Sequence, residues 1–252
     1  MITDNLFNEI VLLWTGCGII TFFLLLFVSA PYGRLSRKGW GPKIDSTLAW
    51  ILMETVSFGI MGYLFLITID SFSIAHFIAL LWLGHYGYRA FVFPLVRKKG
   101  ASTMPIVIMC MAMVFNIMNA GVNGFHLFLT DANYSSLWFF DLRFIIGLLL
   151  FLAGFIVNIS SDSYLRSLRR GSEKDYKIPQ KGFFRFISCP NYFGEIMEWC
   201  GWALLTFSLA GLSFAVWTIA NLLPRALSYH KWYKQTFTDY PENRKAIIPF
   251  LL

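Results

Sequence analysis

The sequence feature that most constrains the fold is a series of apolar stretches, each long enough to cross a lipid bilayer. A transmembrane helix needs about 20 predominantly apolar residues to span the hydrocarbon core. We identify seven such stretches: Phe7–Ala30, Thr47–Ile69, Ile74–Pro94, Met104–Leu129, Leu137–Asn158, Tyr192–Ser208 and Leu212–Pro224. The last two meet near Ala210 and Gly211 and could form one segment. The pattern predicts an all-α, multi-pass integral membrane protein.

The composition supports this prediction, because hydrophobic residues make up 57% of the chain and charged residues only 14%. A soluble domain carries about 25% charged residues. Its four cysteines lack the paired spacing of a metal site, so we expect no bound metal. No repeat or low-complexity segment divides the chain, and we expect one membrane-embedded domain over residues 1–252.

The placement of Lys and Arg predicts the orientation. Basic residues follow the first, third, fifth and seventh stretches, whereas the other connections carry Asp70 or Asp131 and no Lys or Arg. By the positive-inside rule, the N-terminus is outside, the C-terminus is cytosolic and about seven helices cross the membrane. This odd number favours splitting the last apolar run in two. We therefore expect the basic residues behind the net charge of +7 to orient the protein in the membrane and to contact lipid headgroups. No nucleic-acid partner is expected.

The stretch Asn191–Trp199 places polar groups at the cytosolic mouth of the sixth apolar segment. Glu195 and Glu198 are three residues apart, so they share one face of a helix. Carboxylates at such a depth are costly unless they are paired, and they therefore mark a candidate site.

A second candidate site combines Glu54 and Tyr86. They lie roughly 10 and 12 Å of helix from the cytosolic ends of two successive, oppositely directed stretches. At similar depth in adjacent helices, a carboxyl and a phenol could form a hydrogen bond. The alternative is that Glu54 is only a buried structural group. For His126 and the pair Asp141 and Arg143, near the outer face, we favour a structural role.

Polar residues recur at helical spacing near three predicted cytosolic helix ends. The sets are Asn158, Asp162, Arg166 and Arg169; Asn191, Glu195, Glu198 and Trp202; and Arg225, Tyr229 and Tyr233. Such a collection suits an anionic, polar cofactor, since Arg side chains bind phosphates through two parallel hydrogen bonds. Neither a Rossmann fingerprint nor a P-loop is present in the sequence.

Several motifs resemble the steroid 5α-reductase family. They are Pro31–Arg34, Glu54, His85–Arg89, Asn158–Arg169, Tyr176–Gln180, Cys189–Trp199 and the tail Arg225–Pro249, which includes Tyr240–Pro249. The likeness is strong from about Asp141 to the C-terminus and patchier before it. Two positions depart from familiar animal members, which carry Gln where Met53 stands and often His where Tyr229 stands.

The resemblance implies an NADPH-dependent reductase that converts 3-oxo-Δ4 steroids to 5α-steroids by hydride transfer to C5. Glu54 and Tyr86 would hold the C3 carbonyl as catalytic residues. The family's cofactor positions match Tyr32, Arg34, Arg89, Asn158, Asp162, Arg169, Tyr176, Asn191, Glu195, Arg225 and Tyr233. The expected substrate-binding residues are Trp50, Met53, Glu54, Tyr86, Phe115 and Trp199. Residues 1–136 would supply the substrate-side helices, and residues 137–252 most cofactor contacts.

The steroid is expected to enter from the bilayer into a monomeric protein. The host membrane would be the endoplasmic reticulum of a eukaryote or the inner membrane of a bacterium. Three alternatives stay open: another enone, enoyl or sterol double-bond reductase; an isoprenylcysteine or phospholipid-type methyltransferase using S-adenosylmethionine; and a transporter or other seven-helix ligand-binding protein. The methyltransferases share a Pro-x-Tyr-x-Gly motif like that at Pro190–Gly194.

Overall fold

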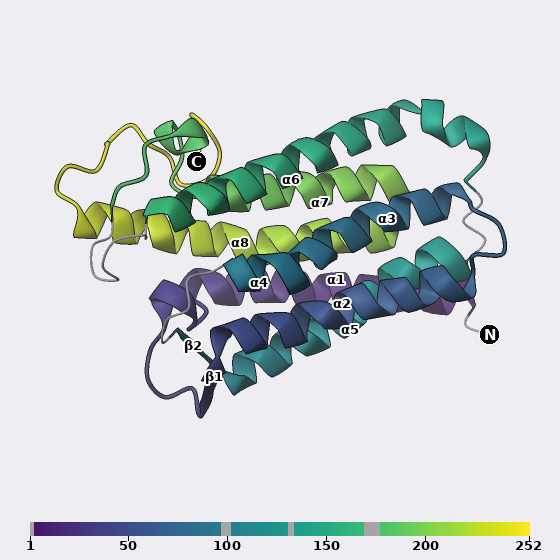
Figure 1. Cartoon of the computed structure of the whole chain (residues 1–252), viewed down its shortest axis with the longest axis horizontal. Helices are drawn as coiled ribbons and strands as arrows, with labels where there is room; N and C mark the ends of the chain where they lie inside the picture. The colour runs from purple at the N-terminus through teal and green to yellow at the C-terminus, as the bar shows by residue number, and fades with distance from the viewer. Residues whose placement is uncertain (1–2, 97–101, 131–133, 169–176) are drawn as a thin grey trace. The chain divides into compact units, whose positions relative to one another are not determined.

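A computed structural model describes residues 3–96, 102–130, 134–168 and 177–252, and 76% of these described residues are helical. The long helices are α1 (Asp4–Phe27), α2 (Ser46–Ile67), α3 (Ile74–Gly87), α5 (Ile106–Leu129), α6 (Leu142–Leu168), α7 (Pro190–Thr206) and α8 (Leu209–Thr236) (Figure 1). Shorter elements are η1 (Gly33–Leu35), η2 (Tyr88–Val92), α4 (Phe93–Val96), η3 (Ser136–Phe140), η4 (Gly182–Arg185) and the strands β1 (Lys43–Asp45) and β2 (Thr103–Pro105).

Four of these helices, α1, α2, α5 and α6, are long and apolar enough to cross a membrane. Large hydrophobic side chains are exposed on them, including Leu13, Leu66, Val114 and Leu149. Such exposure suits contact with lipid, where apolar side chains need no protein cover. The prediction of an all-α membrane protein is therefore confirmed, whereas the number of seven crossings and their orientation stay predictions.

The chain forms two compact units. The first unit contains Met1–Val11, Ala30–Ile145 and Leu205–Gly211, and the second unit contains Leu12–Ser29, Ile146–Leu204 and Leu212–Leu252.

In the first unit, α2 and α5 pack side by side and run in the same direction. The side-chain amide of Asn116 reaches the carbonyl oxygen of Met53, and further along Gly124 lies against Met61. A two-stranded ribbon of β1 and β2, which the sequence did not predict, stands where both helices begin (Figure 1). Asp45 ends β1 and caps α2, because its carboxylate accepts hydrogen bonds from two backbone amides of the first turn.

In the second unit, α6 and α7 are in backbone contact through glycines. A Cβ atom on Gly154 would lie 2.4 Å from the amide nitrogen of Glu198, and one on Gly194 would lie 2.6 Å from that of Asn158. Gly201 approaches the backbone of Phe151 as closely, so the two helices run antiparallel. Small residues at such contacts let membrane helices approach closely.

The helices α7 and α8 are separate, as the predicted split of the last apolar run requires. The break falls at Phe207 and Ser208 rather than near Gly211. Phe207 has a φ of 40°, which ends α7, and the Ser208 hydroxyl accepts a hydrogen bond from the amide of Gly211 in the first turn of α8. The seventh apolar stretch continues past Pro224 as helix to Thr236, as expected.

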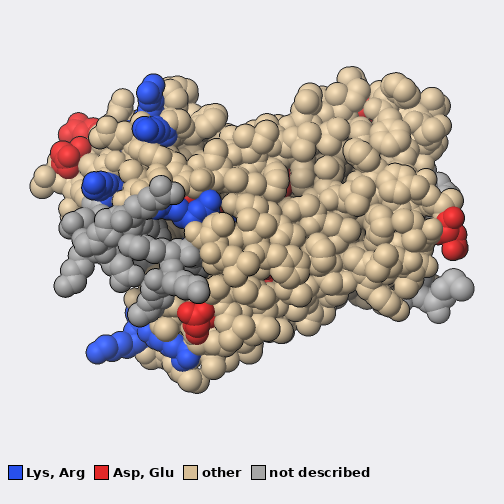
Figure 2. Space-filling model, in the orientation of Figure 1, with Lys and Arg blue, Asp and Glu red and all other residues tan. Residues whose placement is uncertain are grey.

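The visible charges are unevenly distributed. On the face shown in Figure 2, Lys and Arg side chains gather near the C-terminal segment and near β1 and β2. The surface of the long helices that this view shows is formed almost entirely by uncharged residues. This separation is the one that a membrane protein needs, because charged side chains in the hydrocarbon region are costly.

Candidate active site

The first group of candidate residues lies on α2 and α3 in the first unit. Glu54 and Met53 are buried in α2, with exposed fractions of 9% and 6%, and Tyr86 is buried in α3 at 3%. The Tyr86 ring packs against Trp82, with ring centroids 5.0 Å apart. The helices α2 and α3 are in contact. The structure thus places the carboxyl and the phenol in neighbouring helices, both shielded from solvent, and a direct bond between them stays a prediction.

A π-helical turn, η2, follows α3 and carries Arg89. The amide of Phe93 bonds the carbonyl of Tyr88 five residues back, instead of four as in an α-helix. Pro94 explains this change, because it has no N–H to bond the carbonyl of Ala90 and its ring would collide with that carbonyl. Turns of this type inside helices are frequent at functional sites.

Within η2, Arg89 is buried against Glu54 and two aromatic rings. The distance from its Nη2 to Glu54 Oε1 is 4.0 Å, which is within ion-pair range and too long for a hydrogen bond between these two atoms. Its guanidinium carbon lies 4.6 Å from the ring centroid of Trp50 and 4.8 Å from that of Phe93. Sequence reasoning assigned Arg89 to the cofactor, but in the structure its neighbours include the catalytic and substrate candidates Glu54 and Trp50.

The second group lies in the second unit, where the glycine contact brings α6 and α7 together. The Asn158 amide donates to the backbone oxygen of Asn191 at 2.9 Å and to Glu195 Oε2 at 3.1 Å. The Asn191 amide donates to Asp162 Oδ1 at 3.0 Å. These four residues, predicted separately from two stretches, therefore form one hydrogen-bonded cluster. Glu198, on the same helix, is fully buried where α7 touches Gly154.

Arg225 of α8 binds two tyrosine hydroxyls, one on α7 and one on α8. Its Nε donates to the Tyr192 hydroxyl at 2.9 Å, and its Nη2 donates to the Tyr229 hydroxyl at 3.2 Å. Arg225 is buried, with an exposed fraction of 7%. Another predicted residue of α8, Tyr233, stacks on Tyr240, with ring centroids 5.2 Å apart.

A third network, which sequence reasoning missed, joins the C-terminal segment to α8. The Ser188 hydroxyl lies 2.6 Å from His230 Nδ1 and 2.6 Å from the Tyr240 hydroxyl, and it donates to the carbonyl of Lys245. Burial, followed by the charges of Lys234, Arg244 and Lys245, lowers the pKa of His230. Burial raises the pKa of Tyr240. These residues are far apart in the sequence, and no spacing in it indicates that they meet.

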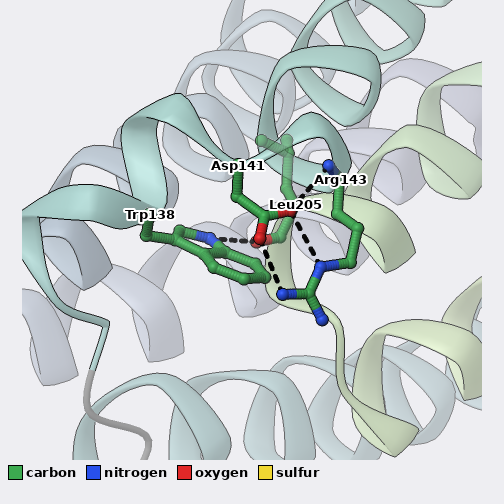
Figure 3. Close-up of polar contacts among 4 residues, drawn as sticks. All are labelled: Trp138, Asp141, Arg143 and Leu205. Atoms are coloured by element: carbon green, nitrogen blue, oxygen red, sulfur yellow. Dashed lines mark hydrogen bonds and ion pairs between the residues drawn. The ribbon is translucent and has the colours of Figure 1, made fainter.

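At the other end of the first unit, the predicted structural residues hold the turn between α7 and α8. Asp141 binds Arg143 through two hydrogen bonds to its side chain, at 2.8 and 2.7 Å, and Trp138 donates to the carbonyl of Leu205 at 3.0 Å (Figure 3). The Tyr134 hydroxyl donates to the Thr206 carbonyl at 2.7 Å and lies 3.1 Å from His126 Nε2. Burial raises the pKa of Tyr134.

Comparison with known proteins connects these clusters to a family. The family model described as 3-oxo-5-alpha-steroid 4-dehydrogenase matches residues 102–252. The chain is 38% identical to Steroid 5-alpha-reductase DET2 of Gossypium hirsutum, with 98% of each chain covered. It is 36% identical to 3-oxo-5-alpha-steroid 4-dehydrogenase 1 of Bos taurus, over 98% of this chain and 97% of the relative. The chain belongs to the 3-oxo-5-alpha-steroid 4-dehydrogenase family. The family resemblance deduced from the sequence is thereby confirmed.

The members of this family are oxidoreductases, and that chemistry implies a nicotinamide cofactor. The second unit contains groups that fit one. Amide donors, carboxylate acceptors and a buried guanidinium lie on α6, α7 and α8, and they match the carboxamide, hydroxyl and phosphate groups of a dinucleotide. NADPH itself and the individual contacts stay predictions.

The remaining candidates are distributed as follows. Tyr32 is half-buried and packs on a cluster that includes Met53 and Met104. Arg34 lies in η1. Phe115 is half-buried in α5 of the first unit. Trp199 belongs to the second unit, where it packs against Phe214 with ring centroids 4.0 Å apart. Arg169 and Tyr176 lie outside the described residues.

Proposed function

We propose that this protein reduces the 4,5 double bond of 3-oxo-Δ4 steroids to give 5α-steroids, using NADPH. The observation that carries the proposal is the burial of Glu54 and Tyr86 in neighbouring helices of a chain that belongs to the steroid dehydrogenase family. An enone needs a hydrogen-bond donor at its carbonyl oxygen, where negative charge develops during reduction. A buried phenol next to a buried carboxyl supplies that donor and holds it in place.

When bound, the cofactor supplies the hydride that the β-carbon of the enone accepts. Tyr86 donates a hydrogen bond to the C3 carbonyl oxygen, and Glu54 orients Tyr86 or binds the same oxygen. Trp50, Met53 and Phe115 enclose the steroid's apolar rings, and Trp199 is assigned to the same role. Burial strengthens each of these polar contacts, because little water competes for them.

The cofactor would be held by the cluster of α6 and α7 together with Arg225. Asn158, Asn191 and Glu195 bind its nicotinamide end, where an amide and a carboxylate match a carboxamide. Arg residues bind its phosphates, including the ribose phosphate that distinguishes NADPH from NADH. The other residues assigned to the cofactor are Tyr32, Arg34, Arg89, Asp162, Arg169, Tyr176 and Tyr233.

The surrounding architecture is part of the same proposal. Seven crossings, with the N-terminus outside and the C-terminus cytosolic, are supported by the placement of Lys and Arg between the apolar stretches. The steroid enters a monomer from the bilayer, between helices. The host membrane is the endoplasmic reticulum in a eukaryote or the inner membrane in a bacterium. Residues 1–252 act as one catalytic domain.

The test is steroid reduction by purified protein with single-residue variants. Glu54→Gln and Tyr86→Phe should each lower kcat for progesterone or testosterone by about 10²–10³-fold, the usual cost of losing one donor to a developing oxyanion. Both should still bind NADPH, measured by fluorescence titration. The matched control is Tyr63→Phe, which removes a phenol that is 64% exposed on the same α2 helix. Parent rates in both variants, or a product without a new 5α hydrogen, would contradict the proposal.

The cofactor cluster needs its own test. Gly154→Leu should separate α6 from α7, since even a Cβ atom there lies 2.4 Å from a backbone nitrogen. We expect NADPH affinity to fall at least tenfold. Gly16→Leu is the control, because nothing lies within 4 Å of a Cβ atom at that helical position. If Gly154→Leu binds NADPH as tightly as the control, the cluster is not the cofactor site.

A further inference from the structure

One face of α5 carries a stripe of buried amides that the proposed reaction has not used. Asn116, Asn119 and Asn123 follow helical spacing, and their exposed fractions are 5%, 0% and 1%. Polar side chains inside a membrane helix are rare and costly, and they commonly mark ion or proton pathways. Each member of the stripe therefore needs an account of its hydrogen bonds.

Asn116 is accounted for by the packing of α5 on α2. Its Nδ2 donates to the Met53 carbonyl at 2.6 Å. Further along, Gly124 lies against the side chains of Leu64 and Met61, so the two helices stay side by side over this length. Ser57, midway between Met53 and Met61, therefore comes level with the turn of α5 that carries Asn119 and Ala120.

The bond of Asn116 has a consequence for Ser57. A buried serine in a helix ordinarily donates its hydroxyl to the carbonyl four residues back. For Ser57 that carbonyl belongs to Met53, which already receives the amide of Asn116. The Ser57 hydroxyl is completely buried and has no hydrogen-bond partner among the described residues.

On α5, Asn119 also has a buried polar atom that lacks a hydrogen-bond partner among the described residues. Its side-chain oxygen and its backbone oxygen both lie within reach of the Asn123 amide, at 3.4 and 2.9 Å. Its own Nδ2 is buried without a hydrogen-bond partner among the residues that the structure describes. Leaving such a group unsatisfied costs about 1–3 kcal/mol, and ordered water is the usual solution.

Ser57 lies close to the proposed reaction centre. Ser57 follows Glu54 by three residues, which is about 4.5 Å along the helix axis. Trp82 links the two sites, because its Nε1 donates to the Ser57 carbonyl at 3.4 Å and its ring packs against Tyr86. A water molecule at Ser57 and Asn119 would therefore be about one helical turn from the steroid carbonyl.

We propose that the Ser57 hydroxyl and the Asn119 amide hold a water molecule that protonates the α-carbon of the substrate. This inference rests on the proposed function. As the β-carbon gains a hydride, the electron pair of the double bond moves to form the enolate. The α-carbon then takes a proton from this water, and the carbonyl double bond is restored. The hydroxide that remains is neutralised by one proton from the aqueous phase, so each turnover consumes one proton.

The outward continuation of the stripe gives the replacement proton a route. Beyond Asn123, the next residue of this face is His126, whose Nε2 lies 3.1 Å from the Tyr134 hydroxyl. Tyr134 follows α5, near the end that the proposed topology places outside. His126 and Tyr134 can each accept and release a proton, whereas the amides can only position water.

The kinetic test compares Asn119→Leu and Ser57→Ala with Asn116→Leu. The first two should lower kcat by about tenfold to hundredfold, within the range for loss of a positioned proton donor. The solvent deuterium isotope effect on kcat should rise, whereas KM for the steroid and NADPH affinity should stay unchanged. Asn119→Ser, which can still hold a water, should recover most of the rate. Asn116→Leu should lower the thermal midpoint but keep kcat within about threefold, because its amide serves packing.

An unchanged solvent isotope effect in Asn119→Leu and Ser57→Ala would overturn the inference. If Asn119→Leu does not fold, Ser57→Ala decides alone, because it removes only a hydroxyl. An experimental structure gives a second readout. We expect an ordered water within hydrogen-bond distance of both atoms, and protein partners for both atoms without a water would overturn the inference. If the parent protein reduces no steroid enone, the proposed function fails instead.

Discussion

The first unit contains two arginine–carboxylate pairs with the same components and different geometry. Arg89 pairs with Glu54 and lies against two aromatic rings, Trp50 and Phe93. Arg143 pairs with Asp141 and likewise lies against two rings, Trp138 at 4.6 Å and Phe207 at 4.3 Å. The composition of a cluster therefore does not reveal its role.

The two pairs differ in the distance between the arginine and the carboxylate and in how deeply both side chains are buried. Asp141 and Arg143 are two residues apart, share short hydrogen bonds and have side chains that are 29% and 41% exposed (Figure 3). Glu54 and Arg89 come from different helical elements, stay 4.0 Å apart and are 11% and 9% exposed. Exposed pairs contribute little to stability, whereas breaking a buried pair is expensive. The exposed pair fixes a local turn, and the buried pair connects α2 to the π-turn.

The largest difference should appear when each arginine is removed. Arg89→Met removes the guanidinium that pairs with the Glu54 carboxylate, and breaking a buried pair costs about 3 kcal/mol or more, so Tm should fall by roughly 6–12 °C. Arg143→Met should shift Tm by no more than about 2 °C. Thermal unfolding of the purified proteins in one detergent measures both. Equal shifts would mean that burial does not separate the pairs.

A smaller effect should follow from removing the aromatic partner of Arg89. Trp50→Leu loses the cation–π contact with a desolvated guanidinium, worth about 2 kcal/mol, and Tm should fall by roughly 4–8 °C. Phe93→Leu is the comparison, and its effect should be smaller because Phe is the weaker cation–π partner. A larger loss in Phe93→Leu would assign the main contact to the other ring.

Salt should sharpen the contrast further. Raising ionic strength from 0.1 to 1 M shortens the Debye length from about 10 to about 3 Å, and buried pairs are screened much less than exposed ones. A double-mutant cycle on Asp141 and Arg143 should therefore lose most of its coupling at high salt. The cycle on Glu54 and Arg89 should keep its coupling, and a parallel loss in both would show that water reaches the buried pair.

The smallest expected effect is on thermal stability at acid pH. Hydrogen bonds from Arg143 lower the pKa of Asp141 from 3.8 to about 2. The folded-state pKa is depressed, so this stabilisation is complete above about pH 4 and is lost as the pH falls toward 2. The Tm of Asp141→Asn should therefore decline less steeply than that of the parent between pH 4 and 2. An identical slope would mean that the pair does not form in solution.

The sequence predicted the helices well, because apolar length is a local property. The starts of α2 and α3 were predicted within one residue, and the continuation of α8 past Pro224 was anticipated. The small ribbon of β1 and β2 and the π-turn were not predicted. The ribbon depends on pairing between segments about 60 residues apart, and the π-turn depends on how the chain responds to Pro94.

The candidate site was predicted unevenly for the same reason. Asn158, Asp162, Asn191 and Glu195 were selected from helical spacing, and they form one cluster in the structure. The network of Ser188, His230 and Tyr240 was missed, because no periodicity connects residues on three separate segments. The asparagines of α5 were also overlooked. A single amide in an apolar stretch does not indicate a site in the sequence, because only the structure shows which hydrogen bonds it makes.

The sequence by itself determined that this chain is a helical membrane protein and that it belongs to a steroid dehydrogenase family. Hydropathy and motif identity are written residue by residue, so they need no fold to be recognised. The tertiary structure decided which polar groups meet. It paired Arg89 with Glu54, tied Asn116 to the carbonyl of Met53, and left polar atoms of Ser57 and Asn119 buried without a hydrogen-bond partner among the described residues. A hydrogen bond between helices forms or fails with changes of a few tenths of an ångström in the distance between donor and acceptor. Only the packing of the helices sets that distance.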